Sequence, residues 1–341
     1  MTSSPVPRPP ETPSVADLVD AMHVVSVPMR VRFRGVTHRE VALLRGPAGW
    51  GEFGPFLEYA PAESARWLAA AVEAAWEGPP PSLRDHVPVN ATVPAVPPER
   101  VAAVLARFPG ATTVKVKVAE AGEGPADDLD RVAAVRDHLG GDGLIRVDAN
   151  GGWDVEQARE ALRRLSAYGL EYAEQPCESV EELAELRRAL ARDGIDVPVA
   201  ADESIRRAED PLRVRDLEAA DVVVVKVAPL GGARAALRVV ADCGLPAVVS
   251  SALETSVGIA AGVALAAALP DLPYACGLGT VALLESDVTV HPMLPRDGRL
   301  PVRRSTPDQG LLERFAVPPD RRRWWADRLA ASAAYLYADV P

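Results

Sequence analysis

Short apolar runs recur between residues 87 and 276, and most of them are separated by stretches with helical periodicity. The runs cover residues 87–93, 113–118, 144–147, 171–173, 197–201, 222–227, 247–249 and 273–276. Amphipathic helices are predicted between them, as at 154–168 and 179–192, because apolar residues there recur with the period of a helix. Strands that alternate with helices form parallel sheets, and eight such strands can close into a barrel. The pattern therefore predicts an α/β fold, a (β/α)7β TIM-like barrel.

A separate α+β capping domain is predicted at residues 15–82. Residues 24–33 and 40–44 alternate like strands, residues 49–52 read as a turn-rich break, and Pro61 opens a helix that extends to Trp76. Three prolines at 79–81 mark a linker to the barrel domain, which we place at 83–290. Residues 291–341 are expected to return to the capping domain, and the proline-rich residues 1–14 to be disordered.

Composition narrows the classes of partner. The formal net charge is −11 at pH 7 and no basic patch stands out against it, which argues against nucleic acid and anionic membranes as partners. The apolar run at 259–269 is too short to span a bilayer and is predicted to be a buried helix. The three cysteines lack the spacing of a zinc site or a disulfide framework. These features predict a soluble protein of a reducing compartment, most simply the cytoplasm.

Charged side chains lie at the C-terminal ends of successive apolar runs. They are Lys115 and Lys117 on the second run, Asp148 on the third, Glu174 on the fourth, Asp202 on the fifth and Lys226 on the sixth. From Lys117 onward, neighbouring members are 24 to 31 residues apart, about the length of one βα unit. We therefore expect them at equivalent positions on adjacent strands, on the barrel face where active sites are found.

Three carboxylates that converge from adjacent strands need a cation. Two like charges about 4 Å apart repel each other by ~4 kcal/mol at an effective dielectric near 20. Asp148, Glu174 and Asp202 together offer a hard, oxygen-only ligand set, which suits Mg²⁺, with Mn²⁺ as the alternative. The sequence thus predicts a divalent metal site in the barrel domain.

Three lysines flank the predicted metal site. Lys115 and Lys117 are two residues apart on one strand, so both side chains point to the same face, and Lys226 comes from the far side of the ring. A lysine of ordinary pKa, about 10.4, is a poor base at neutral pH. A nearby cation and a desolvated pocket lower that pKa and make a neutral amine available for general base catalysis.

Each of these residues has a simpler explanation when it is taken alone. An Asp at a strand end commonly caps the next helix, Glu203 with Ser204 would form a similar cap, and a lone Lys is often only solvated. Gly231 and Gly232 suit either a phosphate-binding turn or a plain turn. The separate explanations do not account for carboxylates flanked by lysines at one level of successive strands. We interpret the set as an active site.

The same residues resemble the enolase superfamily, muconate-lactonizing subgroup, from about residue 24 to residue 312. Lys115-Val116-Lys117 matches that superfamily's KxK strand, whose second lysine, here Lys117, is the general base, while Lys115 tunes it electrostatically. The resemblance further assigns Asp148, Glu174 and Asp202 to the metal-ligand positions and Lys226 to the opposing lysine.

Within the subgroup, three segments resemble the o-succinylbenzoate synthase family. They are Gly49-Trp50-Gly51-Glu52 with Pro55, residues 250–258 and residues 277–280. The resemblance implies a Mg²⁺-dependent hydro-lyase of menaquinone biosynthesis, which dehydrates 2-succinyl-6-hydroxy-2,4-cyclohexadiene-1-carboxylate to 2-succinylbenzoate with syn geometry. It implies that Lys117 removes the proton alpha to the carboxylate, that the metal stabilises the enediolate, and that Lys226 stabilises the anion electrostatically.

Further residues are expected around this centre. Arg146 supports Lys117 or the substrate carboxylate, or else is a buried structural charge. Asn150 and Glu203 are expected to hold the ligands in place. Substrate contacts, most plausibly with the succinyl tail, are expected from Ser250, Ser251 and Gly277. Capping segments around 31–36 and 53–59 are expected to close over the barrel mouth.

Two alternatives to the dehydratase remain open at this point. An N-succinylamino-acid racemase or dipeptide epimerase would use the same site, with Lys117 and Lys226 as paired acid and base. A metal-binding barrel that has lost catalysis would lack one of the charged groups, and the sequence has them all. The expected partner is a small-molecule carboxylate, and the sequence leaves monomer and homo-oligomer equally open.

Overall fold

The computed structural model describes residues 12–33, 35–206 and 211–338, and begins with a capping domain of three antiparallel strands. The strands are β1 (Met22–Phe33), β2 (Val36–Gly46) and β3 (Gly49–Phe53), and the helices are α1 (Val15–Asp20), α2 (Pro61–Val72) and the π-helix η1 (Glu73–Glu77). Ser14 caps α1 through a bond from the Asp17 amide, and Pro61 opens α2. Residues 1–11 of the segment expected to be disordered lie outside the described residues.

The stretch 49–52, which the sequence suggested was a break, is an edge strand. It is part of β3, which pairs with β2 in a register that sets Gly46 opposite Gly49. Gly49 has a φ of +134°, a conformation open to glycine but not to side-chain-bearing residues, so the hairpin turns tightly at this point. The glycine-rich composition therefore marked a strand with a tight turn at its start.

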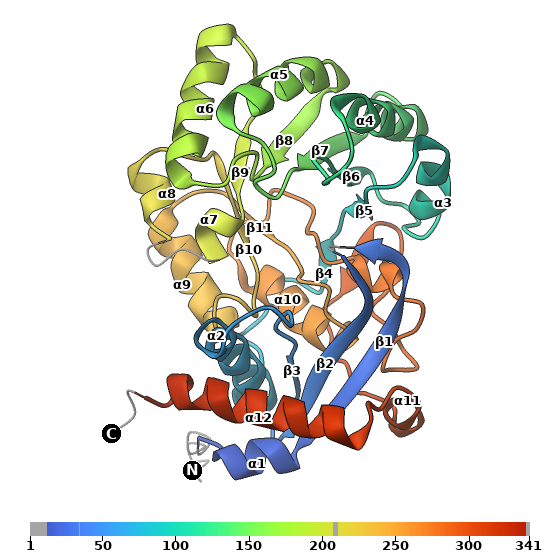
Figure 1. Cartoon of the computed structure of the whole chain (residues 1–341), viewed down its shortest axis with the longest axis vertical. Coiled ribbons are helices and arrows are strands. Elements are labelled where there is room, and N and C mark those ends of the chain that lie inside the picture. The colour runs from blue at the N-terminus through green and yellow to red at the C-terminus, as the bar shows by residue number, and fades with distance from the viewer. Residues whose placement is uncertain (1–11, 34, 207–210, 339–341) are drawn as a thin grey trace, which may run out of the picture.

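Seven parallel strands form the curled sheet of the barrel domain, as the alternating pattern predicted (Figure 1). Their order is β11-β10-β9-β8-β7-β6-β5. The bounds are β5 (Ala91–Val93), β6 (Thr113–Lys117), β7 (Leu144–Asp148), β8 (Leu170–Glu174), β9 (Val199–Ala201), β10 (Val222–Val225) and β11 (Ala247–Val249). The strands are nearly all buried along their length, because helices cover the outer face.

The eighth predicted strand, 273–276, is shorter than expected and closes the sheet by isolated bridges. Cys276 bridges to Val89 before β5, and Gly277 bridges to Ser250 after β11. The Cys276 amide donates to the Pro88 carbonyl at 2.7 Å, and the Gly277 amide donates to the Val249 carbonyl at 2.9 Å. This segment therefore joins the two edges of the seven-stranded sheet.

The first apolar run, 87–93, is divided between two sheets. Its first part belongs to β4 (His86–Pro88), which pairs antiparallel with β12 (Arg299–Pro301), and only the second part is the barrel strand β5. Alternation alone could not show this division, because the partner of β4 lies more than 200 residues away in the chain.

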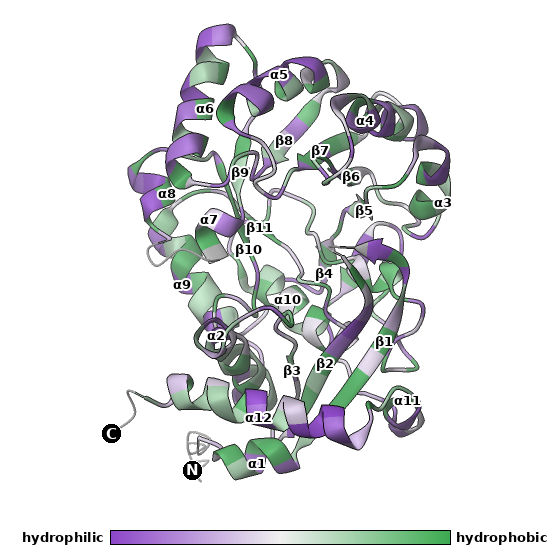
Figure 2. Ribbon diagram, viewed as in Figure 1, coloured by the Kyte–Doolittle hydropathy of each residue, from purple (hydrophilic) through white to green (hydrophobic). Residues whose placement is uncertain are grey.

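Helices surround the sheet on its outer face (Figure 1). They are α3 (Val101–Leu105), α4 (Pro125–Leu139), α5 (Val155–Leu165), α6 (Val180–Asp193), α7 (Glu203–Arg206), α8 (Arg213–Asp216), α9 (Ala233–Cys243) and α10 (Ser256–Ala268), with shorter turns η2 (Pro98–Arg100), η3 (Ser166–Tyr168) and η4 (Thr280–Leu283). Capping boxes at Asp154 and Ser179 start α5 and α6. The apolar run at 259–269, predicted as a buried helix, is mostly α10, whereas α5 and α6 carry hydrophilic surface (Figure 2).

The C-terminal residues lie against the capping domain. α11 (Gln309–Arg314) is followed by α12 (Pro319–Leu336), which packs on α2 and beside α1 (Figure 1). Trp325 of α12 is fully buried, stacks edge-on against Phe53 and donates from its indole nitrogen to Glu40 at 3.0 Å. In the described part of the chain, no helix has the length and apolarity needed to cross a membrane.

Two carboxylates of the capping domain cap the first turns of two barrel helices. Glu52 accepts bonds from the Thr255 hydroxyl at 2.6 Å and from the Gly258 amide at 3.1 Å, at the start of α10. Glu73 accepts bonds from the amides of Ala233 and Arg234 at the start of α9. Amide groups at a helix N-terminus have no partner within the helix, so these carboxyl groups satisfy them and attach the cap to the barrel.

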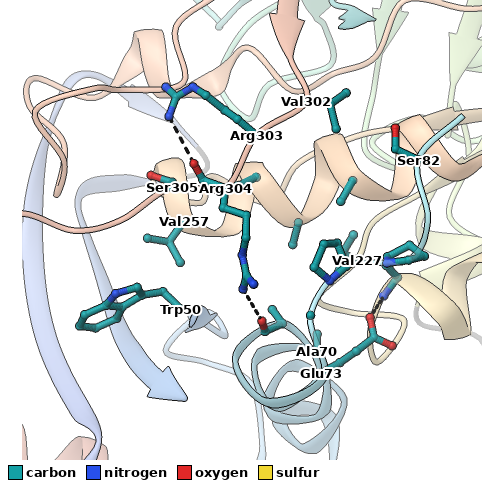
Figure 3. Close-up of a pocket in the computed structure, with 18 residues that line it drawn as sticks. Trp50, Ala70, Glu73, Ser82, Val227, Val257, Val302, Arg303, Arg304 and Ser305 are labelled. Carbon is teal, nitrogen blue, oxygen red and sulfur yellow. Dashed lines mark hydrogen bonds between the residues drawn. The ribbon is translucent and has the colours of Figure 1, made fainter. Parts of the chain in front are cut away.

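A cavity of about 200 Å³ lies in the same interface, between α2, α10 and the C-terminal segment (Figure 3). Its walls are mostly apolar, with Trp50 and Val257 among them. Arg304 enters it and donates to the carbonyl oxygens of Ala48 and Ala74. No lysine lines this cavity, so it is distinct from the charged site described below.

Burial raises the pKa of Glu52 to about 8, and the neighbouring Glu254 carboxylate adds to the shift. In the unfolded chain the group titrates near its ordinary value of 4.5. Between these two pKa values the folded state binds more protons than the unfolded state. The contribution of Glu52 to the free energy of unfolding is therefore present at low pH and is lost as the pH rises from 4.5 through 8.

Replacing Glu52 by Gln is expected to flatten the dependence of stability on pH between 4.5 and 8, because the amide keeps the shape of the side chain but cannot titrate. The effect is at most about 1.4 kcal/mol of unfolding free energy per pH unit. Denaturant unfolding in EDTA at a series of pH values measures it. Glu156→Gln, at an exposed position of α5, is the control, and parallel curves for wild type and Glu52→Gln would contradict the prediction.

Candidate active site

The strand ends bring the six predicted lysine and carboxylate side chains to one end of the barrel. Lys117 of β6 is in register with Asp148 of β7, which is in register with Glu174 of β8. Asp202 directly follows β9, and Lys226 directly follows β10. The spacing of about one βα unit in the sequence corresponds to this common level in the sheet.

The lysines and carboxylates are in direct contact. The Lys115 ammonium lies 2.7 Å from Glu174 Oε1 and 3.0 Å from Asp148 Oδ2. The Lys117 ammonium lies 2.6 Å from the same Asp148 oxygen, and Lys226 is paired with Asp202. All six residues are at most 9% exposed, so these charges are compensated by one another and hardly by water.

Burial and mutual charge shift the proton affinities in opposite directions. Burial lowers the pKa of Lys117, with help from the Lys115 charge and against the attraction of Asp148. Burial would also lower the pKa of Lys115, but Asp148 and Glu174 together raise it well above its usual range. Although burial alone would raise it, Lys115 and Lys117 hold the pKa of Asp148 well below its usual range. Burial and then repulsion by Asp148 raise the pKa of Glu174 to about 7.

The carboxylates present oxygens that suit a divalent ion, although ammonium groups lie between them. Among the described residues, no three His, Cys, Asp or Glu side chains lie close enough together to hold an ion directly. Glu174 Oε2 is buried and has no hydrogen-bond partner. A buried, unsatisfied carboxylate oxygen is costly, and a cation would satisfy it. The all-oxygen donor set and this orphaned oxygen fit a hard divalent cation.

All of the chain's lysines are in this site. The sequence has three lysines and 34 arginines, so every other basic side chain is arginine. An arginine stays protonated under all ordinary conditions, whereas a buried lysine can lose its proton. The restriction of lysine to positions 115, 117 and 226 therefore indicates the site from composition alone, independently of motif and spacing.

Two residues with left-handed backbone conformation, Asn150 and Gln175, make hydrogen bonds beside the carboxylates. Asn150, with a φ of +48°, accepts a bond from Lys117 and donates to Glu203 at 3.3 Å. Gln175, with a φ of +39°, accepts bonds from the amides of Asp202 and Ser204 at 2.9 and 3.2 Å. Asn150 and Glu203 were expected from the sequence to hold the ligands, whereas no role was predicted for Gln175, which directly follows Glu174. Gln175 orients the loop that carries Asp202.

A small cavity opens beside the charged groups. Its lining residues are Thr92, Lys115, Lys117, Asp148, Asn150, Lys226, Ser250, Ser251, Ala252, Leu253, Gly277 and Thr280. The Ser251 and Thr280 hydroxyls lie 2.8 Å apart. A Cβ on Gly277 would lie 2.5 Å from the Ser250 hydroxyl, so a larger residue there would require that hydroxyl to move. The structure thus places Ser250, Ser251 and Gly277 at the cavity. It adds Ala252, Leu253 and Thr280, which lie in the segments 250–258 and 277–280 but had no predicted contact, and Thr92, which the sequence did not indicate.

Arg146 lies deeper in the barrel than the charged site. It is fully buried, and its guanidinium donates to Glu171 at 2.5 Å and to the Ala275 carbonyl at 2.6 Å. Its guanidinium carbon also lies 4.7 Å from the centre of the Tyr172 ring. Arg146 does not line the cavity, although it is in register with Lys115, because its guanidinium is held by Glu171 and the Ala275 carbonyl. These contacts favour the interpretation of a structural charge and not the predicted substrate contact.

Comparison with known families gives two domain matches. Residues 24–75 match the family described as enolase N-terminal domain-like, and residues 99–311 match the family described as enolase C-terminal domain-like. Members of this superfamily generally use a divalent metal. The matched ranges contain all but the first two residues of the capping sheet and all six charged residues of the site.

Individual relatives extend over almost the whole chain. The o-succinylbenzoate synthase of Mycobacterium tuberculosis (strain ATCC 25618 / H37Rv) is 57% identical over 96% of this chain and 98% of its own. The o-succinylbenzoate synthase of Mycobacterium leprae (strain TN) is 58% identical over 95% of each chain.

Among solved structures, muconate lactonizing enzyme from Pseudomonas putida has a TM-score of 0.72 at 23% identity, covering 87% of this chain and 98% of its own. A dipeptide epimerase from Enterococcus faecalis has a TM-score of 0.67 at 21% identity, covering 83% and 96%. The two structural similarities show a shared fold.

The site predicts stabilisation by divalent metal. Mg²⁺ at about 100 times its dissociation constant should raise the free energy of unfolding by about 2.7 kcal/mol. The stabilisation should disappear in Glu174→Gln, because this substitution removes the negative charge of the carboxylate that carries the orphaned oxygen. Glu171→Gln, on the same strand but paired with Arg146, should keep it. Thermal shift with and without metal measures the effect, and an equal shift in Glu174→Gln would contradict the assignment.

Proposed function

We propose that this chain, which belongs to the o-succinylbenzoate synthase family of the enolase superfamily, is a dehydratase. Its substrate would be 2-succinyl-6-hydroxy-2,4-cyclohexadiene-1-carboxylate and its product 2-succinylbenzoate. This is a hydro-lyase reaction of menaquinone biosynthesis. The observation that carries the proposal is the set of three lysines and three buried carboxylates at one end of the barrel, in contact with a cavity. That set supplies a base, a metal site and positive charge around the acidic carbon.

Asp148, Glu174 and Asp202 would hold the metal, Mg²⁺ or in its place Mn²⁺. When bound, the ion supplies positive charge beside the substrate carboxylate, which makes the adjacent C–H bond more acidic. Gln175 supports this role because it fixes the backbone at Asp202. Lys115 supports it by holding Glu174 and Asp148 together on adjacent strands.

Lys117 is the proposed general base. Its amine lines the cavity and is held by Asp148 and Asn150, so its position is set from two sides. It takes the proton alpha to the ring carboxylate, and the electrons of that C–H bond pass into the carboxylate to give an enediolate anion. The electrons of the anion then form the new ring double bond as the C–O bond breaks. The protonated Lys117 then gives its proton to the departing hydroxide on the same face, so that water leaves.

Lys226 and Lys115 act through charge in this scheme. Lys226 extends into the same cavity from the strand beyond Asp202 and stabilises the anion that forms. Lys115 remains protonated, since its carboxylate partners favour the charged form. With Lys117 neutral as the base, three carboxylates, two ammonium groups and a divalent ion would leave the site with one positive charge. Positive charge in the site favours the binding of a substrate with two carboxylates.

A racemase or epimerase remains the second candidate, because Lys117 and Lys226 line the same cavity. In such an enzyme each lysine would exchange a proton on one face of the alpha carbon. In deuterated water the protein would exchange the alpha proton of N-succinyl amino acids, and Lys226→Ala would stop exchange from one enantiomer only. The absence of any exchange would remove this candidate.

Replacing Lys117 by Ala should lower kcat of dehydration by about 10³-fold, the size of a general base contribution. The assay follows the ultraviolet absorbance as the ring becomes aromatic. Stabilisation by Mg²⁺ should persist in the variant, which shows that the site is still assembled. If wild-type protein fails to dehydrate the cyclohexadiene acid, or if Lys117→Ala retains full activity, the proposal is wrong.

A further inference from the structure

Arg39 of β2 joins the capping domain to the loop that follows β11. The side chain is only 3% exposed. Its guanidinium donates to the carbonyl oxygens of Leu253 at 3.0 Å, of Ala252 at 3.4 Å and of Gly54. The first two acceptors belong to the barrel domain and the third to the cap, so one side chain bonds to both.

The barrel residues that Arg39 holds form one wall of the catalytic cavity. Ala252 and Leu253 line that cavity together with Lys226. Leu253 has a φ of +64°, in the left-handed region that residues other than glycine rarely adopt. Such a conformation is strained and persists only where its surroundings hold it. The bond from Arg39 to the Leu253 carbonyl provides that constraint.

Two acidic residues hold the amides of the same loop. Glu254 accepts a bond from the Ala252 amide at 2.6 Å, and Glu52 of the cap accepts bonds from the Thr255 amide at 3.1 and 3.2 Å. Arg39 interacts electrostatically with both of these buried carboxylates and also lies over the Phe56 ring, at 4.8 Å. The loop's carbonyl groups are thus bound by a cation, and its amides by two acids.

We propose that Arg39 is a positioning residue for the reaction. By fixing the backbone of residues 252 and 253, it sets the wall of the cavity against which the substrate binds, while the lysines and carboxylates are held independently on their strands. The inference rests on the proposed dehydration only for its kinetic test. The contacts of Arg39 belong to the cap–barrel interface and do not depend on which substrate is bound.

The kinetic test compares Arg39→Met with a matched control, Arg328→Met. Arg328 of α12 is also buried, and it donates to the carbonyl oxygens of Phe56 and Tyr59, which belong to the cap. Both substitutions remove a buried guanidinium that binds carbonyl groups, but only Arg39 reaches the cavity wall. Arg39→Met should raise KM about tenfold and change kcat less than about threefold, because uniform binding is lost and the reacting groups stay in place. Arg328→Met should leave KM unchanged.

Arg39→Lys separates charge from geometry. The lysine keeps the positive charge between Glu52 and Glu254, but an ammonium cannot reproduce the fork of a guanidinium. It should therefore recover thermal stability while KM stays high, and added guanidinium ion should lower the KM of Arg39→Met. If Arg39→Met matches Arg328→Met in KM, the proposal is overturned.

Hydrogen exchange gives a readout that does not need the substrate. Arg39→Met should speed exchange of the amides at 252–255, and Arg328→Met should leave them at the wild-type rate. Unchanged exchange in Arg39→Met would overturn the positioning role even if the enzyme were active. Faster exchange with no dehydration by the wild type would instead retain this role and reject the proposed function.

Discussion

Mutual compensation of three buried carboxylates and three buried lysines is the interaction on which the site depends. Asp148, Glu174 and Asp202 would repel one another strongly in a dry barrel, and each is in contact with an ammonium group. The same compensation makes the groups chemically unequal, since Lys115 is bound to two carboxylates and Lys117 is the lysine whose pKa is lowered. Asp148, Glu174 and Asp202 would hold a divalent ion, which would add positive charge to this arrangement.

The capping domain completes the barrel by the same electrostatic means. Its carboxylates Glu52 and Glu73 bind the amide ends of two barrel helices, and its Arg39 binds carbonyl groups of the loop after β11. Each contact places a buried carboxyl or guanidinium group against backbone groups that can hydrogen-bond to it, so the polar groups on both sides have partners. The wall of the cavity is therefore set by residues about 200 positions away in the chain.

The fold and the charged centre were predictable because both repeat with the βα unit. Residues 117, 148, 174, 202 and 226 are one unit apart, and parallel pairing converts that spacing into a common level.

The cap contacts of Arg39 and Glu52 were not predictable, since nothing local marks a side chain whose partner is about 200 residues away. The placement of Arg146 was open because alternation gives its face but not its depth. The shortened closing strand at 276 depends on bridges to two edges, which a run of apolar residues cannot reveal. The confinement of lysine to the site was visible in the sequence and would have strengthened the prediction.

The most direct test is a crystal structure of the protein grown with Mn²⁺ and 2-succinylbenzoate, with the metal located by its anomalous scattering. The account predicts one strong peak about 2.0–2.2 Å from oxygens of Asp148, Glu174 and Asp202, as expected for a hard divalent ion, with the amines of Lys117 and Lys226 on opposite sides of the product ring. A peak elsewhere, or a product bound away from these lysines, would contradict it.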